Sequence, residues 1–333
     1  MRYQNPVYPE YFADPFVWKH DGVYYAVGTG AVEAHSDVGH SAAALTVDGE
    51  AGVFLILRSN DLASWTPVGS ALKILHADYG DAYWAPEVAF ADGRFYLYYS
   101  IGRGDKAHHI RVAVSSRPEG PYYDAGARVT DPFRVPFAID ASPFQDEDGQ
   151  WYLFYARDFL DTDGGNRAGT AVVVDRLIDM TRLAGEERVV ARARHDWQRF
   201  VANRVMYGGI YDWHTIEGPC VRKRDGRYYC LFSAGRWENE TYGVDFAVAD
   251  QVTGPYTCDS NDDGARLLRT LPGRVLGPGH NSMTEGPDGK SDYIVYHAWD
   301  PKMIARRMYI DPMEWTAEGP RCKGPTTTVQ QLE

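Results

Sequence analysis

Three acidic residues stand at the start of short apolar runs, each with a proline one to three residues further on. They are Asp14 before Pro15, Asp140 before Pro143, and Glu217 before Pro219. Hydrolysis of a glycosidic bond uses two carboxyl groups: a protonated one for the leaving oxygen and an ionised one on the other face of the sugar. An aspartate before a proline also begins many ordinary turns, so each acid alone is compatible with a structural role. The chemistry depends on whether the three acids meet.

A signature that recurs five times predicts where they lie. Each copy crosses a short apolar stretch, turns at Asp-Gly and enters an aromatic strand; the Asp-Gly pairs are residues 21–22, 92–93, 148–149, 225–226 and 288–289. Asp-Gly between apolar runs is the strongest short-range hairpin signal. The period is roughly sixty to seventy residues, longer than the ~40–50 of common propeller repeats, which implies long loops. Five hairpin-rich repeats with almost no helical periodicity predict an all-β, five-bladed β-propeller.

The chain shows no linker and no break in composition, so one domain is expected over residues 1–333. Two tandem β-sandwiches are the competing architecture, but they would not explain the fivefold register. One short helix is expected around residues 175–183. Three loops are longer than turns require, residues 28–52, 156–170 and 195–214, and the first and third are expected to shape a site.

In a propeller the first strand of each repeat lines the central channel, so its start lies at the channel mouth. Aligning positions 15, 86, 143, 219 and 282 brings together the residues just before them: Asp14, Trp84, Asp140, Glu217 and His280. Trp84 could be ordinary core, although an aromatic ring at the mouth suits a sugar. His280 could simply hydrogen-bond to the strands. The segment 131–133 copies Asp14-Pro15-Phe16, but no Asp-Gly follows at the repeat spacing, so Asp131 is interpreted as a decoy.

Composition excludes several classes of protein. The formal net charge of -12 disfavours nucleic acid as a partner. No run of eighteen apolar residues predicts a membrane span, and the first residues show no secretory signal, so a cytoplasmic location is expected. A two-residue turn at Asp225-Gly226 would place Cys220 and Cys230 on opposite faces of a hairpin, which disfavours a disulfide; reduced cysteines fit the same compartment.

Five motifs in order resemble glycoside hydrolase family 43: residues 13–17 (ADPFV), 83–87 (YWAPE), 139–144 (IDASPF), 215–219 (TIEGP) and 277–282 (GPGHNS). The resemblance extends from Asn5 to about Pro320 and implies a five-bladed propeller and an inverting mechanism. It implies that Asp14 is the general base, that Glu217 is the general acid, and that Asp140 orients Glu217 and raises its pKa.

The resemblance also implies substrate-binding roles for Trp84, Phe16 and Arg306, with Arg307 as the alternative to Arg306. Related arabinan-degrading members hold a metal ion, often calcium, near the histidine equivalent to His280, largely through water. The chemistry itself requires no cofactor. A saccharide is the only partner implied; no nucleic acid, membrane or protein partner is.

Family members release α-L-arabinofuranose or β-D-xylose, or cut arabinan internally. The 277–282 motif and the absence of a further C-terminal sandwich domain resemble the arabinose-specific members. The first interpretation is therefore an exo-acting α-L-arabinofuranosidase on arabinan or arabinoxylan; the alternatives are a β-D-xylosidase and an endo-1,5-α-L-arabinanase. The long segment 195–214 favours a blocked pocket over the open groove of an endo enzyme. A non-catalytic sugar-binding propeller could lose any of the acids, and WD or kelch propellers carry signatures that this sequence lacks.

Overall fold

The computed structural model describes residues 1–30, 46–47 and 49–333, so the segment 28–52 falls largely outside the described residues. Almost all regular structure in the described part is β-strand, apart from two 3-10 turns, η1 (Asp163–Gly165) and η2 (Asp196–Gln198). No helix in that part is long and apolar enough to cross a membrane. The expectation of an all-β protein is confirmed.

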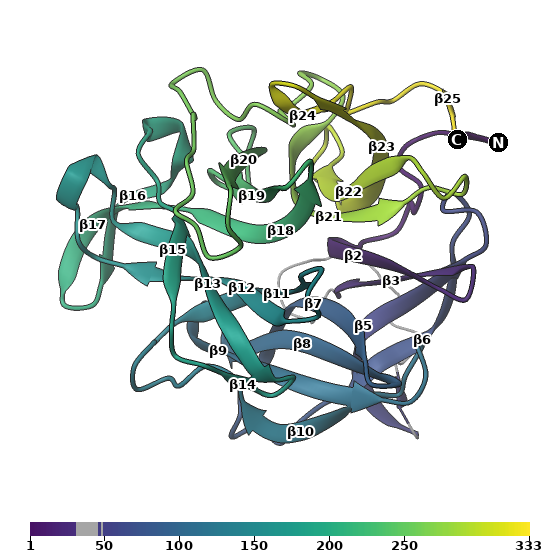
Figure 1. The fold of residues 1–333 in the computed structure, drawn as a ribbon, viewed down its shortest axis with the longest axis horizontal. Helices are drawn as coiled ribbons and strands as arrows, with labels where there is room; N and C mark the ends of the chain where they lie inside the picture. The colour runs from purple at the N-terminus through teal and green to yellow at the C-terminus, as the bar shows by residue number, and fades with distance from the viewer. Residues whose placement is uncertain (31–45, 48) are drawn as a thin grey trace.

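Five sheets follow one another along the chain, antiparallel except for one parallel pairing within the third, and a two-stranded sheet joins the ends of the chain (Figure 1). The first sheet contains β2 (Ala13–His20), β3 (Val23–Thr29), β4 (Thr46–Val47), β5 (Glu50–Ser59) and β6 (Thr66–Lys73), and the second contains β7 (Ala82–Ala91), β8 (Arg94–Arg103), β9 (Lys106–Ser115) and β10 (Tyr123–Arg128). The third sheet contains β11 (Ala138–Gln145), β12 (Trp151–Phe159), β13 (Gly169–Asp179), β14 (Arg182–Leu183), β15 (Arg188–Ala191), β16 (Arg199–Met206) and β17 (Gly209–His214). The fourth sheet contains β18 (Ile216–Arg224), β19 (Arg227–Ala234) and β20 (Gly243–Ala249), the fifth contains β21 (Leu276–Glu285), β22 (Asp292–Trp299), β23 (Arg306–Thr316) and β24 (Gly319–Cys322), and β1 (Arg2–Tyr3) pairs with β25 (Gln330–Gln331) at the chain ends.

The first strands of the five sheets form a closed ring. Strand β2 contacts β7, β7 contacts β11, β11 contacts β18, β18 contacts β21, and β21 contacts β2 again. Four sheets have four or more strands, whereas the fourth has three, with an isolated bridge between Val248 and Thr257 beside β20. The predicted propeller-like arrangement is therefore confirmed.

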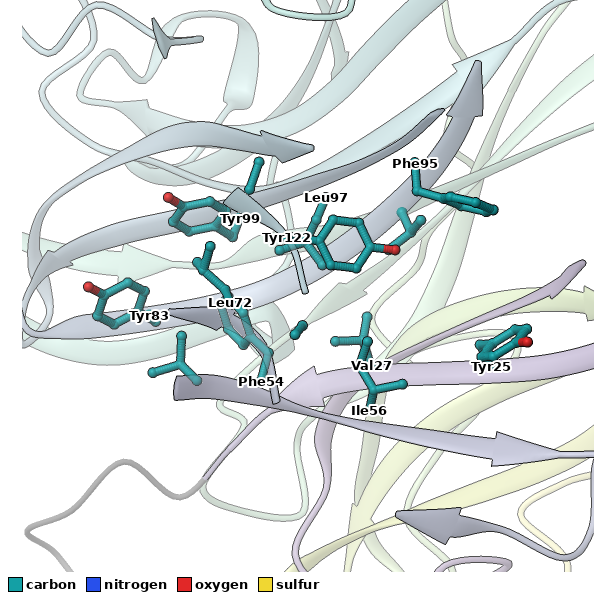
Figure 2. Packing of buried hydrophobic residues seen from close by; sticks show 14 of the residues in the cluster. Tyr25, Val27, Phe54, Ile56, Leu72, Tyr83, Phe95, Leu97, Tyr99 and Tyr122 are labelled. Atoms are coloured by element: carbon teal, nitrogen blue, oxygen red, sulfur yellow. The ribbon is translucent and has the colours of Figure 1, made fainter. Parts of the chain in front are cut away.

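The core lies between neighbouring sheets and not in the channel. One buried apolar cluster fills the space between the two sheets of each neighbouring pair, including the fifth and first sheets. Figure 2 shows the cluster between the first two sheets, where Val27, Ile56 and Leu72 face Leu97 and Tyr99. Burial of such side chains contributes about 1.5–3 kcal/mol each, so this packing fixes how the sheets sit around the ring.

Three of the five Asp-Gly pairs form the predicted two-residue hairpin turns, at residues 21–22, 92–93 and 225–226, with both residues at positive φ as a type I′ turn requires. The turns around 148–149 and 288–289 are longer, because their strands end at Gln145 and Glu285 and resume at Trp151 and Asp292. Cys220 pairs with Leu231 and Val221 with Cys230, which is the predicted register, and all four cysteines are free.

The helix expected around residues 175–183 is wrong. Most of this segment belongs to β13, which pairs along its length with β12 and on its other side with β15. The alternating burial of Asp175, Leu177 and their neighbours fits a strand, so pairing on two sides outweighs local helical preference. The aromatic loop expected at 195–214 is a β-hairpin, β16–β17, that projects at the edge of the molecule on the left of Figure 1.

Candidate active site

Each innermost strand carries a β-bulge at its start. The register with the second strand shifts there, and one residue adopts a positive φ: Asp14 (49°), Ala85 (46°), Asp140 (59°), Gly218 (57°) and His280 (48°). A bulge re-aims the side chains beside it. The five residues are structurally equivalent. The sequence alignment of the repeats was therefore wrong in two of them, because the structural equivalents of Pro15 are Ala141 and Asn281, and not Pro143 and Ser282. Asp14, Asp140 and His280 occupy the bulge, whereas Trp84 and Glu217 precede it.

Side chains from the preceding sheet hold four of these bulges. The backbone N–H groups of Asp14 and Ala85 donate to His297 Nδ1 (3.0 Å) and Thr29 Oγ1 (2.8 Å). Those of Gly218 and His280 donate to Asp140 Oδ2 (3.0 Å) and Ser233 Oγ (2.7 Å). A buried N–H without a partner is costly, so these bonds couple the placement of each strand start to its neighbour around the ring.

Asp14 lies at the centre of a cluster of cationic and ionisable groups. Its Oδ1 is 3.2 Å from His297 Nδ1, 3.4 Å from His280 Nδ1 and 3.5 Å from Arg306 Nη1. His280 Nδ1 is also 4.0 Å from Asp140 Oδ2. The side chains of Asp14 and Asp140 are only 11% and 4% exposed, so water screens these interactions little.

The surroundings of Asp14 keep it ionised. Burial alone would raise its pKa, but His280, Arg306 and His297 outweigh that effect and hold the pKa of Asp14 well below its usual value. Burial lowers the pKa of His280 and brings that of His297 to about 4, so the two histidines carry positive charge beside Asp14 chiefly at acidic pH. The permanent positive charge beside Asp14 is therefore the guanidinium of Arg306.

Glu217 and Asp140 are shifted in the opposite direction. Burial and the charge of Asp14 raise the pKa of Glu217, although the hydroxyl of Tyr242, which donates to Oε1 at 2.7 Å, and Arg306 work against them. Burial, Glu217 and Asp14 raise the pKa of Asp140 well above its usual value, against the N–H that Gly218 donates. Asp140 and Glu217 are therefore a coupled pair of carboxyl groups, both with raised pKa values, next to Asp14, whose pKa is lowered.

Arg306, and not Arg307, is the arginine that contacts Asp14. Its Nη2 also donates to the hydroxyl of Tyr11 (2.6 Å), and its guanidinium lies 4.4 Å from the ring centre of Trp237. Trp237 is stacked on Trp299 at 6.1 Å. Arg307 instead donates to the carbonyl of Pro9 and pairs with Asp300. The ion pair with Asp14 thus has an aromatic wall beside it.

Trp84 and Phe16, the other predicted substrate-binding residues, lie at opposite ends of the channel. Trp84, at the mouth, is stacked on His108 with ring centres 3.7 Å apart. Phe16 is stacked on Trp18 and lines a cavity formed by the far halves of the innermost strands, because the bulge interrupts the alternation that would have put it on the side of Asp14. Among the described residues, neither its stacking partner nor the core cluster it packs against includes one of the acids.

The groups around His280 do not fit a protein-bound calcium ion. The described residues contain no group of three or more His, Cys, Asp or Glu side chains that could hold a metal. Calcium takes about six to eight oxygen ligands, whereas Asp14 beside His280 already faces the guanidinium of Arg306. Hydrolysis by paired carboxyl groups requires no cofactor.

Sequence reasoning missed Tyr242, His297 and the tryptophan pair. Tyr242 comes just before β20, and His297 is on the second strand of the fifth sheet. Both therefore lie outside the starts of the innermost strands, from which the site residues were predicted. His297 ends the aromatic run 293–297 of the fifth repeat, which was a visible signal. Nothing local in the sequence marks Tyr242.

The arrangement suits acid–base hydrolysis. The pKa of one buried carboxyl group is lowered and that of a second is raised to about 7, and the two groups come from different sheets around one channel mouth. That difference in proton affinity is what a general base and a general acid require at the same pH.

Comparisons with known proteins agree with this chemistry. The family model for glycosyl hydrolases family 43 matches residues 3–320. A β-D-galactofuranosidase of Aspergillus niger is 30% identical over 88% of this chain and 75% of its own length. An extracellular exo-α-(1→5)-L-arabinofuranosidase of Streptomyces chartreusis is 27% identical over 91% of this chain and 84% of its own. The crystal structure of a thermostable family-43 glycoside hydrolase superposes with a TM-score of 0.81 and 29% identity, over 99% of this chain and 98% of its own.

The expected cytoplasmic location is contradicted by these relatives. Several of them are named extracellular, including the arabinofuranosidases of two Streptomyces species and an arabinanase of Bacillus subtilis. Free cysteines were a poor guide, because Cys220 and Cys230 are buried and thus protected from oxidants in any compartment.

Proposed function

The chain belongs to glycosyl hydrolase family 43, and from this premise we propose that it releases α-L-arabinofuranose from the ends of arabinose-containing oligo- and polysaccharides such as arabinan and arabinoxylan. The 27% identical exo-acting arabinofuranosidase supports this substrate. We also propose that residues 1–333 are one catalytic domain and that the five sheets are its five blades, the fourth lacking an outer strand.

The opposite pKa shifts of Asp14 and Glu217 support the division of roles. Asp14, ionised beside Arg306, acts as the general base that takes a proton from water. Glu217, whose pKa is raised by burial, donates its proton to the leaving oxygen. Asp140 positions Glu217, because its Oδ2 accepts the N–H of the adjacent Gly218. The water attacks from the face opposite the leaving group, so the released sugar has the inverted configuration.

The β16–β17 hairpin supports exo action. Its Arg204 pairs with Asp105 of the β8–β9 turn at 2.8 Å, and its Tyr207 hydroxyl donates to Asp158 at the end of β12. At its base, the ring of Phe200 lies 5.4 Å from the guanidinium of Arg236, next to Trp237. The segments of the second and third sheets that carry Asp105 and Asp158 lie beside the starts of β7 and β11. The hairpin therefore forms one side of the channel mouth.

A second candidate substrate is β-D-galactofuranose, because the 30% identical relative is a β-D-galactofuranosidase. Its ring has the same configuration as that of α-L-arabinofuranose, and it differs by one further hydroxymethylene unit on the exocyclic chain. One pocket could bind both rings, and the space beyond the exocyclic carbon would discriminate between them by about 1–3 kcal/mol.

The test is a side-by-side measurement of kcat/KM on the 4-nitrophenyl glycosides of α-L-arabinofuranose, β-D-galactofuranose and β-D-xylopyranose. We expect the arabinofuranoside to be fastest and NMR to show the inverted anomer as the first product. A faster galactofuranoside or xyloside would replace the proposed substrate. A retained anomer would overturn the roles of Asp14 and Glu217.

A further inference from the structure

The channel has a second opening, at the end opposite the acids. A cavity of about 630 Å³ lies there, formed by the far halves of all five innermost strands: residues 16–19, 87–90, 142–145, 220–222 and 283–285. This volume is within the ~300–1,000 Å³ typical of small-molecule sites. None of Asp14, Asp140, Glu217, His280 or Arg306 lines it, so it is distinct from the candidate active site.

Flat aromatic rings from three sheets line this far cavity. Phe16 and Trp18 of β2 are stacked at 6.0 Å and 27°, and Phe90, Phe144 and Trp151 come from the second and third sheets. The ring of Phe90 is 47% exposed, which is high for so large an apolar side chain. Aromatic faces of this kind pack against the C–H faces of sugar rings.

Two buried polar atoms of the lining have no partner among the described residues. They are Oε2 of Glu87, a residue only 7% exposed, and Nε1 of Trp18. Burial raises the pKa of Glu87 well above its usual value, which favours the protonated form that both donates and accepts. Buried polar groups normally have partners. Both atoms have almost no exposed area, so a ligand hydroxyl, which donates and accepts, would reach them once these side chains turn toward the cavity.

The charges around the far cavity cancel. Lys19 and Arg222 carry positive charge, and Asp21 and Glu285 carry negative charge; Lys19 and Glu285 pair at 3.2 Å. Glu87 is a further acidic side chain of the lining, and its burial favours the uncharged form. The balance disfavours a phosphate, a nucleotide or a free cation, and favours a neutral ligand.

We propose that the far cavity is a second, non-catalytic saccharide-binding site, which takes the end of a neutral pentose-containing oligosaccharide. Aromatic faces provide the stacking surface, and Glu87 and Trp18 provide the hydrogen bonds. Such a site would hold the enzyme on a polysaccharide while the active site at the other end of the channel hydrolyses a free chain end. Binding of the polymer at one site thus raises its effective concentration at the other site.

The test is calorimetric titration of the Glu217→Gln variant, which cannot turn the ligand over, with α-1,5-arabinotriose and separately with β-1,4-xylotriose. We expect two binding events. Glu87→Leu should weaken one of them about tenfold, the loss of roughly one hydrogen bond, and Phe90→Ala should weaken the same event. Glu87→Leu removes the unpartnered Oε2 together with a hydrogen bond to Ser142, whereas Phe90→Ala leaves Glu87 in place, so agreement between the two variants separates loss of the site from a folding defect.

Controls separate the two ends of the channel. Trp84→Ala should affect only the other event, and Phe133→Ala, at a ring 94% exposed and outside the cavity, should affect neither. In the active enzyme, Phe90→Ala should leave hydrolysis of small 4-nitrophenyl glycosides unchanged. If no event with either trisaccharide responds to Glu87→Leu, the far cavity is only a water-filled channel end and the proposal is wrong. An event that responds to Glu87→Leu but not to Trp84→Ala supports it even if the proposed catalytic substrate fails.

Discussion

Asp14 and Glu217 should fail differently when each is replaced. Asp14→Ala removes the group that activates water, so kcat should fall about 10²–10⁴-fold on every substrate. Glu217→Ala removes the proton donor, so the loss should be of that size on arabino-oligosaccharides but much smaller on 4-nitrophenyl glycosides, whose leaving group needs little protonation. The measurement is the ratio of rates on the activated and natural substrates. Equal ratios in both variants and the parent would contradict the assigned roles.

Two neighbours should move the pH profile in opposite directions. The Tyr242 hydroxyl donates to Glu217 and favours its ionised form, so Tyr242→Phe should raise the pKa of Glu217 and move the basic limb of kcat/KM to higher pH. Asp140→Asn removes the second member of the coupled pair, so it should lower that pKa and move the same limb to lower pH.

The matched control is Tyr228→Phe, which breaks a similar bond to a carboxylate, Asp146, at 2.7 Å near the far end of the channel. Its profile should match that of the parent. Shifts of the same sign for Tyr242→Phe and Asp140→Asn would show that the limb does not report the ionisation of Glu217.

At the scale of the element, close packing at the start of β21 supports the acid. A Cβ atom on Gly279 would lie 2.2 Å from Cε1 of Tyr242, a residue that is 1% exposed and cannot move outward. Gly279→Ala should therefore displace Tyr242 from Glu217 and lower kcat/KM about a hundredfold, as for a misplacement of about 1 Å. The assay uses arabino-oligosaccharides. Gly30→Ala, with no atom of the described residues within 4 Å of the added methyl group, should have no effect; a normal rate for Gly279→Ala would refute the supporting role.

The sequence predicts the position of a residue well where that position depends on a single hairpin or strand. Asp-Gly turns and aromatic strands are local signals, so the hairpins, the register of Cys220 and the strand starts with Asp14, Asp140 and Glu217 could be predicted. The side to which Phe16 turns could not, because the bulge beside Asp14 reverses simple alternation. Tyr242 reaches Glu217 only through the packing of β20 against β21, which no local pattern encodes.

At the scale of the whole molecule, the N-terminal segment is attached to the fifth sheet. The side-chain amide of Asn5, 6% exposed, donates to the carbonyl of Ile310 (2.7 Å) and accepts its N–H (2.9 Å), and Val7 N–H donates to Met308. Asn5→Ala should leave both buried groups of Ile310 unpaired and reduce the free energy of unfolding by about 1–3 kcal/mol. Urea unfolding measures this. Gln4→Ala, which loses only an exposed bond to Thr327, should be nearly neutral; equal midpoints for the two variants would argue against the attachment.

The shared bulge has a consequence for how this scaffold changes over evolutionary time. Ala85 and Gly218 hold the same left-handed backbone as Asp14, Asp140 and His280, although neither carries a reactive side chain. The scaffold thus holds the left-handed conformation at all five positions regardless of chemistry, and at Ala85 it does so with an ordinary side chain in place. Point mutations at Ala85 would place a new functional group in an already shaped backbone position at the same mouth, beside an intact acid and base. New substrate preferences can therefore arise one substitution at a time, without any intermediate that has to rebuild the fold.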